Sequence, residues 1–444
     1  MRNAPKIPEA PGRLPVIGHS LRVLRDPLTF LTSLPARGDL VQVRMGPFKG
    51  LVVCDPELTR QVLLDDRTFD KGGPLFDRGR ELSGDGLALS PHRRHRRQRR
   101  LAQPAFHFSR FPGYARTMTA QASAVADSWQ AGQTLDVSDE MMTLAVRTAV
   151  ETMFSDELTA GDLQQSVRDL TTVMKALYRR AAMPPLLERL PLFGNSRYHQ
   201  ARARLRRTLN DVITRRRASR ADHGDLLSAF LAARDDDTDG LGMTETEISD
   251  QVLTFFIAGS DSTAILLSWA LHLLANHPDV EERVHAEVDS VLAGARAGFS
   301  HLPGLELTTR VITETLRLYP PGWVLTRTVT TDTRLGPYSV PAGTTVAYSP
   351  YLVHRRGDLY DAPDRFDPDR WAGDHPQPSR HAYIPFGGGA RKCIADQFGT
   401  IEAVLALATI TARWRLTPLS DGLVRPAAAA TLNPPRMPVL VEAR

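Results

Sequence analysis

The residues that follow Thr244 constrain the fold of this 444-residue chain more than any other feature. Thr244 and Glu247 have the spacing of a capping box, which predicts the start of a helix. Apolar side chains then recur on most sides of that helix, from Ile248 through Phe256 to Leu273. A helix that is apolar nearly all round is buried, so we expect this one to run through the core.

The middle of this helix contains two residues that a purely structural helix avoids. Gly259 costs about 1 kcal/mol relative to alanine, and the Asp261 carboxylate needs a partner or water. Together they predict a local opening of the helix beside a bound ligand. A helix bend with a hydrated aspartate is the alternative interpretation.

The segment 386–395 indicates what that ligand is. Cys393 follows three consecutive glycines, and Cys54 is the only other cysteine, which excludes a disulfide framework and a four-thiolate metal site. Glycines let a backbone lie flat against a bulky ligand, the two basic residues before Cys393 favour a thiolate, and Phe386 shields its sulfur. A thiolate-ligated haem iron requires such a loop, although a small buried cysteine is the alternative.

The remaining sequence indicates a mainly α protein with a small β portion, folded as one domain over residues 1–444. Strands are expected within 39–54, 325–348 and 413–444, and a helix directly after Cys393. No stretch reaches the roughly 18–20 uncharged apolar residues of a membrane span. The proline-rich segment 1–30 lacks a hydrophobic signal core, so we expect a cytoplasmic protein without a membrane anchor.

The densest positive charge, in a chain of net charge +5, is the arginine run of residues 92–100. No aromatic side chains are interleaved with this run, which argues against nucleic-acid binding. His95 and Arg99 are four residues apart and therefore share one face of a helix. A solvated face that also contacts anionic groups is the favoured interpretation.

Segment 386–395 resembles the haem-binding loop of the cytochrome P-450 family, Phe-x-x-Gly-x-Arg-x-Cys-x-Gly. Phe386, Gly389, Arg391 and Cys393 match in register, and Ala395 replaces the last glycine. Residues 258–263 resemble the oxygen-activation motif of that family, and the resemblance extends over essentially the whole chain. It implies the cytochrome P-450 fold, haem b as cofactor, Cys393 as axial ligand of its iron, and monooxygenase chemistry with O2.

The resemblance also implies roles for other side chains. Asp261 and Ser262 would relay protons to dioxygen through ordered water, with Ser262 where threonine is usual and Thr263 beside it. The residues expected to bind the haem propionates are His95, Arg99, Arg327 and Arg391. The residues expected to form a buried cluster that fixes the segment before Cys393 are Glu314, Arg317 and Arg365.

Electrons are expected from a ferredoxin and its reductase. The side chains expected to face solvent on the arginine run are Arg93, Arg94, Arg96, Arg97 and Arg100. Some of them, together with Lys392, would help to dock this donor. Apolar segments at 73–76, 255–257, 323–325 and 431–433 favour a compact hydrocarbon substrate. Similarity to actinomycete members of the family that oxidise sesquiterpenes makes pentalenene the expected substrate. One of its methyl groups would be oxidised to the alcohol and then the aldehyde, in pentalenolactone antibiotic biosynthesis; epi-isozizaene, a fatty acid or a polyketide are alternatives.

Functions from other classes rest on weaker patterns. Asp235, Asp236 and Asp239 complete the pattern with which terpene cyclases bind magnesium and diphosphate, but a polar turn is favoured there and cyclase activity is the remote alternative. A haem-dependent isomerase or binding protein is a third reading, and Asp261 with Ser262 argues for oxygen activation instead. The protein is expected to be a monomer.

Overall fold

The computed structural model describes residues 5–155, 157–181, 194–219, 221–235, 240–373, 378–379, 381–420, 422 and 424–444. Helices predominate and strands are few, so the prediction of a mainly α fold with a small β portion is confirmed. Contacts divide the chain into two compact units. The sheet unit comprises Met1–Asp77, Leu316–Phe366 and Gly373–Cys393, and the helical unit comprises Arg78–Thr315, Asp367–Ala372 and Ile394–Arg444. That residues 1–444 form a single domain stays a prediction.

The sheet unit contains a five-stranded sheet in the order β1-β2-β8-β5-β3, in which only the β2–β8 pair is parallel. Its strands are β1 (Leu40–Met45), β2 (Phe48–Val53), β3 (Phe69–Lys71), β5 (Leu325–Val329) and β8 (Thr345–Tyr348). The other elements of the unit are α1 (Ser20–Arg25), α2 (Pro27–Thr32), η1 (Pro35–Arg37), α3 (Pro56–Leu64), β6 (Thr333–Leu335), β7 (Tyr338–Val340), α15 (Pro350–Val353) and η7 (Gly389–Arg391).

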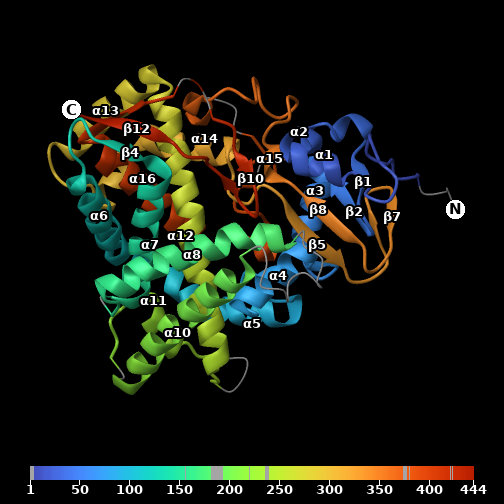
Figure 1. Cartoon of the computed structure of the whole chain (residues 1–444), viewed down its shortest axis with the longest axis horizontal. Coiled ribbons are helices and arrows are strands. Elements are labelled where there is room, and N and C mark those ends of the chain that lie inside the picture. Colours follow the sequence, from blue (N-terminus) through green and yellow to red (C-terminus); the bar gives the residue numbers. More distant parts are fainter. Residues whose placement is uncertain are drawn as a thin grey trace. The chain divides into compact units, whose positions relative to one another are not determined.

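The alternating apolar residues of β1 and β2 place one face of the sheet against α3, as their period of two requires. Val53 of β2 and Val346 of β8 share a buried cluster with Leu58 and Val62 of α3. Figure 1 shows α3 beside β2 and β8. The same cluster includes Ile384, so the core of this sheet extends to the segment that leads into the cysteine loop.

Within the described residues, the helical unit consists of long helices with five short strands, four of them near the end of the chain. Its helices are α5 (His92–Ala102), η2 (Gln103–Phe106), η3 (Phe108–Arg110), α6 (Phe111–Ser128), α7 (Val137–Phe154), α8 (Ala160–Ala181), α10 (Asn195–Ser219), α11 (Leu226–Ala232), α12 (Glu245–Ala275), α13 (Pro278–Leu292), η5 (Phe299–Gly304), η6 (Pro368–Trp371) and α16 (Asp396–Thr411). Its strands are β4 (Thr134–Asp136), β9 (Trp414–Pro418), β10 (Ala427–Ala428), β11 (Leu432–Asn433) and β12 (Pro438–Ala443). Two helices cross the boundary between the units, α4 (Pro74–Ser83) and α14 (Glu306–Leu318).

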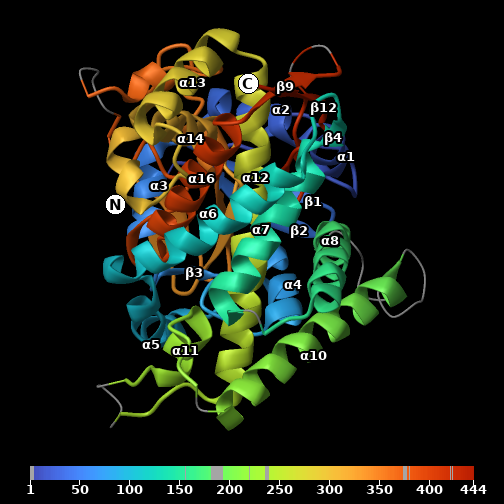
Figure 2. The same ribbon diagram turned by 90° about the vertical axis from the view of Figure 1, so that its left-hand side faces the viewer.

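Helix α12 is the core helix that the sequence predicts. The Thr244 hydroxyl accepts the Glu247 N–H, and the Glu247 carboxylate accepts the Thr244 N–H, so the capping box is confirmed. Figure 2 shows α7 lying across α12, and α10 and α16 also contact it. By length and composition α12 is apolar enough to cross a membrane, but 72% of its most apolar window is buried within the structure, as in any core helix.

Two elements depart from the sequence-based expectations. The sequence predicts a polar hinge over 218–243, whereas α11 forms within it because Asp225 accepts the Ser228 N–H at 2.8 Å and Leu227 and Phe230 are buried. β4 pairs with β12, a partner about three hundred residues later, so no local pattern indicates this strand. The Gly and Pro residues within 183–195 predict a loop, most of which lies outside the described residues, and α10 begins at Asn195.

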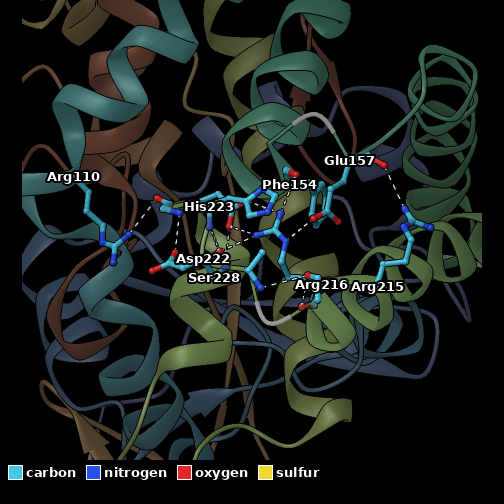
Figure 3. A network of polar contacts seen from close by, with 12 residues as sticks. Arg110, Phe154, Glu157, Arg215, Arg216, Asp222, His223 and Ser228 are labelled. Carbon is cyan, nitrogen blue, oxygen red and sulfur yellow. Dashed lines mark hydrogen bonds and ion pairs between the residues drawn. The ribbon is translucent and has the colours of Figure 1, made fainter.

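A buried arginine fixes the end of α10. The Arg216 guanidinium pairs with Asp225 at 2.9 Å and with Glu157, and it donates to the Ser228 hydroxyl at 2.8 Å and the Phe154 carbonyl at 3.1 Å (Figure 3). A buried cation with two carboxylates is satisfied, whereas loss of one partner typically costs about 3–5 kcal/mol. This network therefore ties α10 to the end of α7 and the start of α11.

Candidate functional site

Cys393 ends a tight loop in the sheet unit. Its N–H donates to the Phe386 carbonyl at 2.9 Å, and within this closed loop the Lys392 N–H donates to the Gly389 carbonyl at 3.1 Å. The Cys393 side chain is exposed, while burial raises the pKa of the Cys54 thiol to about 12, and neither cysteine forms a disulfide. Of the two thiols, only Cys393 is accessible to a ligand.

The glycines before Cys393 serve two purposes. Gly387 and Gly389 have φ values of +71° and +62°, in the left-handed region that glycine tolerates best. A Cβ on Gly389 would lie 2.2 Å from the Leu63 carbonyl oxygen at the end of α3, so that position requires glycine for packing as well. A Cβ on Gly387 would meet only the Tyr348 hydroxyl, at 3.9 Å, so packing does not require glycine at this position. Ala395, with φ −102°, sits in an ordinary conformation and needs no glycine.

Two cations oppose each other beside this loop. Lys71 of β3 and Arg327 of β5 are paired across the strands, where like charges repel. Arg327 is buried, and its guanidinium donates to a backbone carbonyl at 3.1 Å and a tyrosine hydroxyl at 3.3 Å; no carboxylate pairs with it among the residues that the structure describes. Burial and the charges of Arg327 and Arg391 lower the pKa of Lys71 well below its ordinary value, while Cys393 and the Asp70 carboxylate act in the opposite direction. A bound anion would relieve this repulsion.

Arg391 is already engaged by carboxylates. Its Nε donates to Asp66 Oδ2 at 3.1 Å and its Nη2 to Asp70 Oδ1 at 2.6 Å. Burial lowers the pKa of Arg391 even so. The role of Arg391 with a propionate therefore stays a prediction. The Arg327 guanidinium is better placed to pair with an anionic ligand, because two aspartates already neutralise Arg391.

These residues fit a haem with a thiolate-ligated iron. An exposed thiol on a closed loop supplies sulfur, and the opposed cations supply charge for two carboxylates. The sequence did not indicate Lys71, because its position opposite Arg327 depends on how β3 and β5 pair.

The segment leading to Cys393 is held by Arg317 and by a histidine that the sequence did not indicate. Arg317 is buried and donates to the carbonyls of His354 at 2.9 Å and Arg365 at 3.0 Å. His354 Nε2 accepts the Ile384 N–H at 2.9 Å, so its Nδ1 carries the proton and donates to the Arg317 carbonyl at 3.1 Å. Burial lowers the pKa of His354 to about 3, which keeps this bridge neutral.

The predicted role of Arg365 in the buried cluster is wrong for its side chain. That side chain is exposed, and only its carbonyl takes part. Arg370 takes the expected place: its Nε donates to Glu314 Oε1 at 3.0 Å, and Trp371 Nε1 donates to Glu314 Oε2 at 2.8 Å. The reason is the turn η6, which directs Arg370 and Trp371 at Glu314, whereas Arg365 precedes that turn.

Asp261 is held by the tail of the chain within the helical unit. It is buried, and its Oδ2 accepts the Thr431 hydroxyl at 2.9 Å, while Asn433 Nδ2 donates to the same hydroxyl oxygen at 3.2 Å. Trp269 Nε1 donates to the Leu432 carbonyl at 3.0 Å, which anchors β11 on α12. Burial raises the pKa of Asp261 to about 6 and the Thr431 hydrogen bond opposes that rise. The group therefore titrates near neutral pH, as a proton donor requires.

The prediction that α12 opens locally is not met by a break in the helix, because α12 is continuous from Glu245 to Ala275. Instead, part of its surface near Gly259 is not covered by other side chains of the described residues. Ala258 is exposed, and a Cβ on Gly259 would meet nothing within 4 Å. The Ser262 hydroxyl donates to the Ala258 carbonyl at 2.6 Å. Thr263 is buried elsewhere and donates to Glu402 of α16 at 3.3 Å, where burial raises the pKa of Glu402 to about 8. Thr263 thus belongs to a core contact.

Helix α5 carries the predicted basic run. His95 is buried and Arg99 is half-buried, and their role toward a propionate stays a prediction. Arg97 was expected in solvent but is half-buried and pairs with two carboxylates, one of them Asp235 at 3.3 Å. Asp235 is buried and also pairs with a second arginine of α5, which argues against a magnesium site. The rest of that aspartate pattern, at 236–239, lies outside the described residues.

The fold and the cysteine loop define the chain as a haem-thiolate protein. The sequence profile of the cytochrome P-450 family matches residues 8–439, which is nearly the whole chain. The chain belongs to the cytochrome P-450 family and is a monooxygenase, an oxidoreductase. Membership implies a haem-thiolate iron as cofactor.

Relatives and a solved structure agree with this assignment. Cyclooctat-9-en-7-ol 5-monooxygenase of Streptomyces melanosporofaciens is 47% identical over 412 residues, 92% of this chain and 89% of that protein. Pentalenene oxygenase of Streptomyces avermitilis is 45% identical over 428 residues, 96% of this chain and 95% of that protein. The crystal structure of the cytochrome P-450DA haem domain superposes with a TM-score of 0.87 at 29% identity, covering 99% of this chain and 98% of that one. The predicted resemblance to terpene-oxidising actinomycete members is confirmed.

Proposed function

We propose that this monooxygenase oxidises a cyclic, largely hydrocarbon terpene, with pentalenene as first candidate. The observation that carries the proposal is the 45% identity to pentalenene oxygenase over 96% of the chain. The proposed reaction takes one methyl group to the alcohol and then the aldehyde, in pentalenolactone biosynthesis. Cyclooctat-9-en-7-ol is the second candidate, because a relative named for its oxidation is 47% identical.

The proposed cofactor is haem b, whose iron the Cys393 thiolate would bind. When bound, this group supplies activation of dioxygen, which the thiolate promotes by donating electron density. Arg327 and Lys71 are proposed to bind its carboxylates, because their mutual repulsion is relieved by an anion. His95 and Arg99 of α5 are proposed as further partners of the same carboxylates. Arg391 is proposed to contribute less, because Asp66 and Asp70 already neutralise most of its charge.

Asp261 is proposed to supply protons for the reaction. Its carboxyl group exchanges protons near neutral pH because burial raises its pKa to about 6. The hydrogen bond from Thr431 fixes one carboxyl oxygen and leaves the other for water. Ser262 uses its own proton toward the Ala258 carbonyl, so its hydroxyl oxygen is left to accept a hydrogen bond from an ordered water.

The proposed electron donor is an acidic ferredoxin, reduced by its reductase. Arg93 and Arg96 of α5 are exposed, as is Lys392 of the sheet unit. Replacing Arg93 and Arg96 by glutamate should slow reduction by ferredoxin and flatten its dependence on salt, since steering by opposite charge is lost. Unchanged rates in both variants would exclude this surface as the docking site of the ferredoxin.

The enzyme is also proposed to be a cytoplasmic monomer.

One incubation tests the substrate proposal. The purified haem-loaded protein is supplied with ferredoxin, reductase, NADPH and isotopically labelled O2, and is offered pentalenene, cyclooctat-9-en-7-ol, epi-isozizaene and a fatty acid separately. We expect labelled oxygen in the pentalenene product, dependent on both electron-transfer proteins. Turnover of the fatty acid alone would contradict the proposal. Cyclisation of farnesyl diphosphate with magnesium and without electron donors would instead support the remote cyclase alternative.

A further inference from the structure

The beginning of the sheet unit concentrates exposed apolar side chains. Ten large apolar side chains are exposed in the described part of the chain, and six of them gather here: Leu14, Val16, Ile17, Leu21, Leu24 and Met45. Met45 joins the others because Gly18 bridges to it at the end of β1. Single exposed apolar residues are ordinary, whereas a contiguous group marks an interaction surface.

Val16 is the most prominent member of this group. Its side chain is 92% exposed and its φ is +62°, a conformation that is unfavourable for a β-branched residue. Hydrogen bonds between Leu14 and Gly18, at 2.9 and 3.1 Å in the two directions, close the turn and hold Val16 at its tip. The fold thus maintains a strained turn whose apolar side chain gains almost no packing within the chain.

Positive charges lie between these apolar side chains. Arg13, Arg22 and Arg25 are all exposed. The charges of opposite sign nearby are Glu9, which pairs with Arg13 at 3.5 Å, and the exposed Asp26. Arginines interleaved with protruding apolar side chains are complementary to anionic headgroups above acyl chains.

We propose that residues 13–25 together with Met45 dock on the surface of an anionic lipid bilayer, with Val16 and Leu24 entering the boundary between headgroups and acyl chains. A protruding tip fits a fluid phase, whereas a stable protein partner needs a complementary face of roughly 800 Å². The contact is peripheral, because α1 has only six residues. A bilayer concentrates apolar molecules, so docking would bring the enzyme close to a terpene substrate. That benefit rests on the proposed function, whereas the docking itself does not.

Vesicle flotation of the full-length, haem-loaded protein tests this surface. We expect it to float with vesicles of phosphatidylglycerol and phosphatidylcholine, and much less with phosphatidylcholine alone. Val16→Asp and Leu24→Asp should each lower the bound fraction roughly tenfold, because a charge replaces an apolar side chain that enters the bilayer. Leu241→Asp is the matched control, since Leu24 and Leu241 are each 64% exposed and Leu241 lies in the helical unit; it should leave binding unchanged.

Three outcomes would overturn the proposal. The wild type fails to float with the anionic vesicles, or Leu24→Asp and Leu241→Asp lower binding alike. In the third outcome, the protein does not float with vesicles, and light scattering finds a dimer that the Leu24→Asp substitution dissociates. This face would then be a contact between two copies of the chain. Circular dichroism should find all variants folded, because each replaced side chain is exposed.

Discussion

Replacing Thr431 by valine is the sharpest perturbation of the proposed proton donor. The change keeps the side-chain shape and removes the hydroxyl that lies 2.9 Å from Asp261 Oδ2. A hydrogen bond to a charged group contributes about 1.5–3 kcal/mol, and 1.36 kcal/mol corresponds to one pKa unit. Because this bond favours the ionised carboxylate, its loss should raise the pKa of Asp261 from about 6 by roughly one to two pH units.

The assay is the fraction of electrons recovered in product, measured against pH. In the wild type we expect an inflection near pH 6 from Asp261. Thr431→Val should move it to higher pH, Thr431→Ser should keep it in place because the hydroxyl remains, and Asp261→Asn should abolish it. An inflection that stays in place in Thr431→Val but disappears in Asp261→Asn would refute the role of Thr431. One that survives Asp261→Asn would refute the role of Asp261 itself.

The remaining predictions concern the structural residues around the site. Arg370→Ala should lower the free energy of unfolding by about 3–5 kcal/mol, because buried Glu314 loses the guanidinium that lies 3.0 Å from its Oε1. Arg365→Ala should change the free energy of unfolding by less than about 0.5 kcal/mol, because that side chain is exposed. Urea denaturation compares the two variants, and equal effects would contradict the assignment. Lys71→Met should speed transfer of haem to apomyoglobin roughly tenfold, since a cation beside the bound carboxylates is lost, and an unchanged rate would argue against it. His354 has a pKa of about 3 in the folded chain, against an ordinary value of 6.5. Between these two values the unfolded chain binds a proton that the folded chain does not, so the stabilising contribution of His354 is present above pH 6.5 and is lost as the pH falls toward 3. Thermal unfolding should show a weaker pH dependence in His354→Asn over that range, and an identical slope would count against this account.

Local signals in the sequence are sufficient for much of this fold. The capping box at Thr244 and the apolar periodicity after it predict α12, because both depend on residues within a few turns. The glycine run before Cys393 predicts a turn that an ordinary side chain would strain. Alternation over residues 39–54 predicts the β1–β2 hairpin.

The features that the sequence did not indicate depend on distant pairing. Lys71 matters because strand register places it opposite Arg327, and Thr431 because the tail returns to α12 after 170 residues. Arg365 and Arg370 stand in one short segment of similar composition, and only the turn η6 decides which of them reaches Glu314. Such contacts are set by tertiary packing, which a single sequence does not display.

The absorption spectrum of the reduced carbonyl complex tests the central claim, that Cys393 provides a thiolate ligand to the haem iron. Wild type and Cys393→His are compared at equal haem content, because histidine can still hold the iron. We predict the long-wavelength band of a thiolate complex for the wild type, and the shorter-wavelength band of an imidazole complex for Cys393→His. A thiolate band that persists in Cys393→His would contradict the assignment.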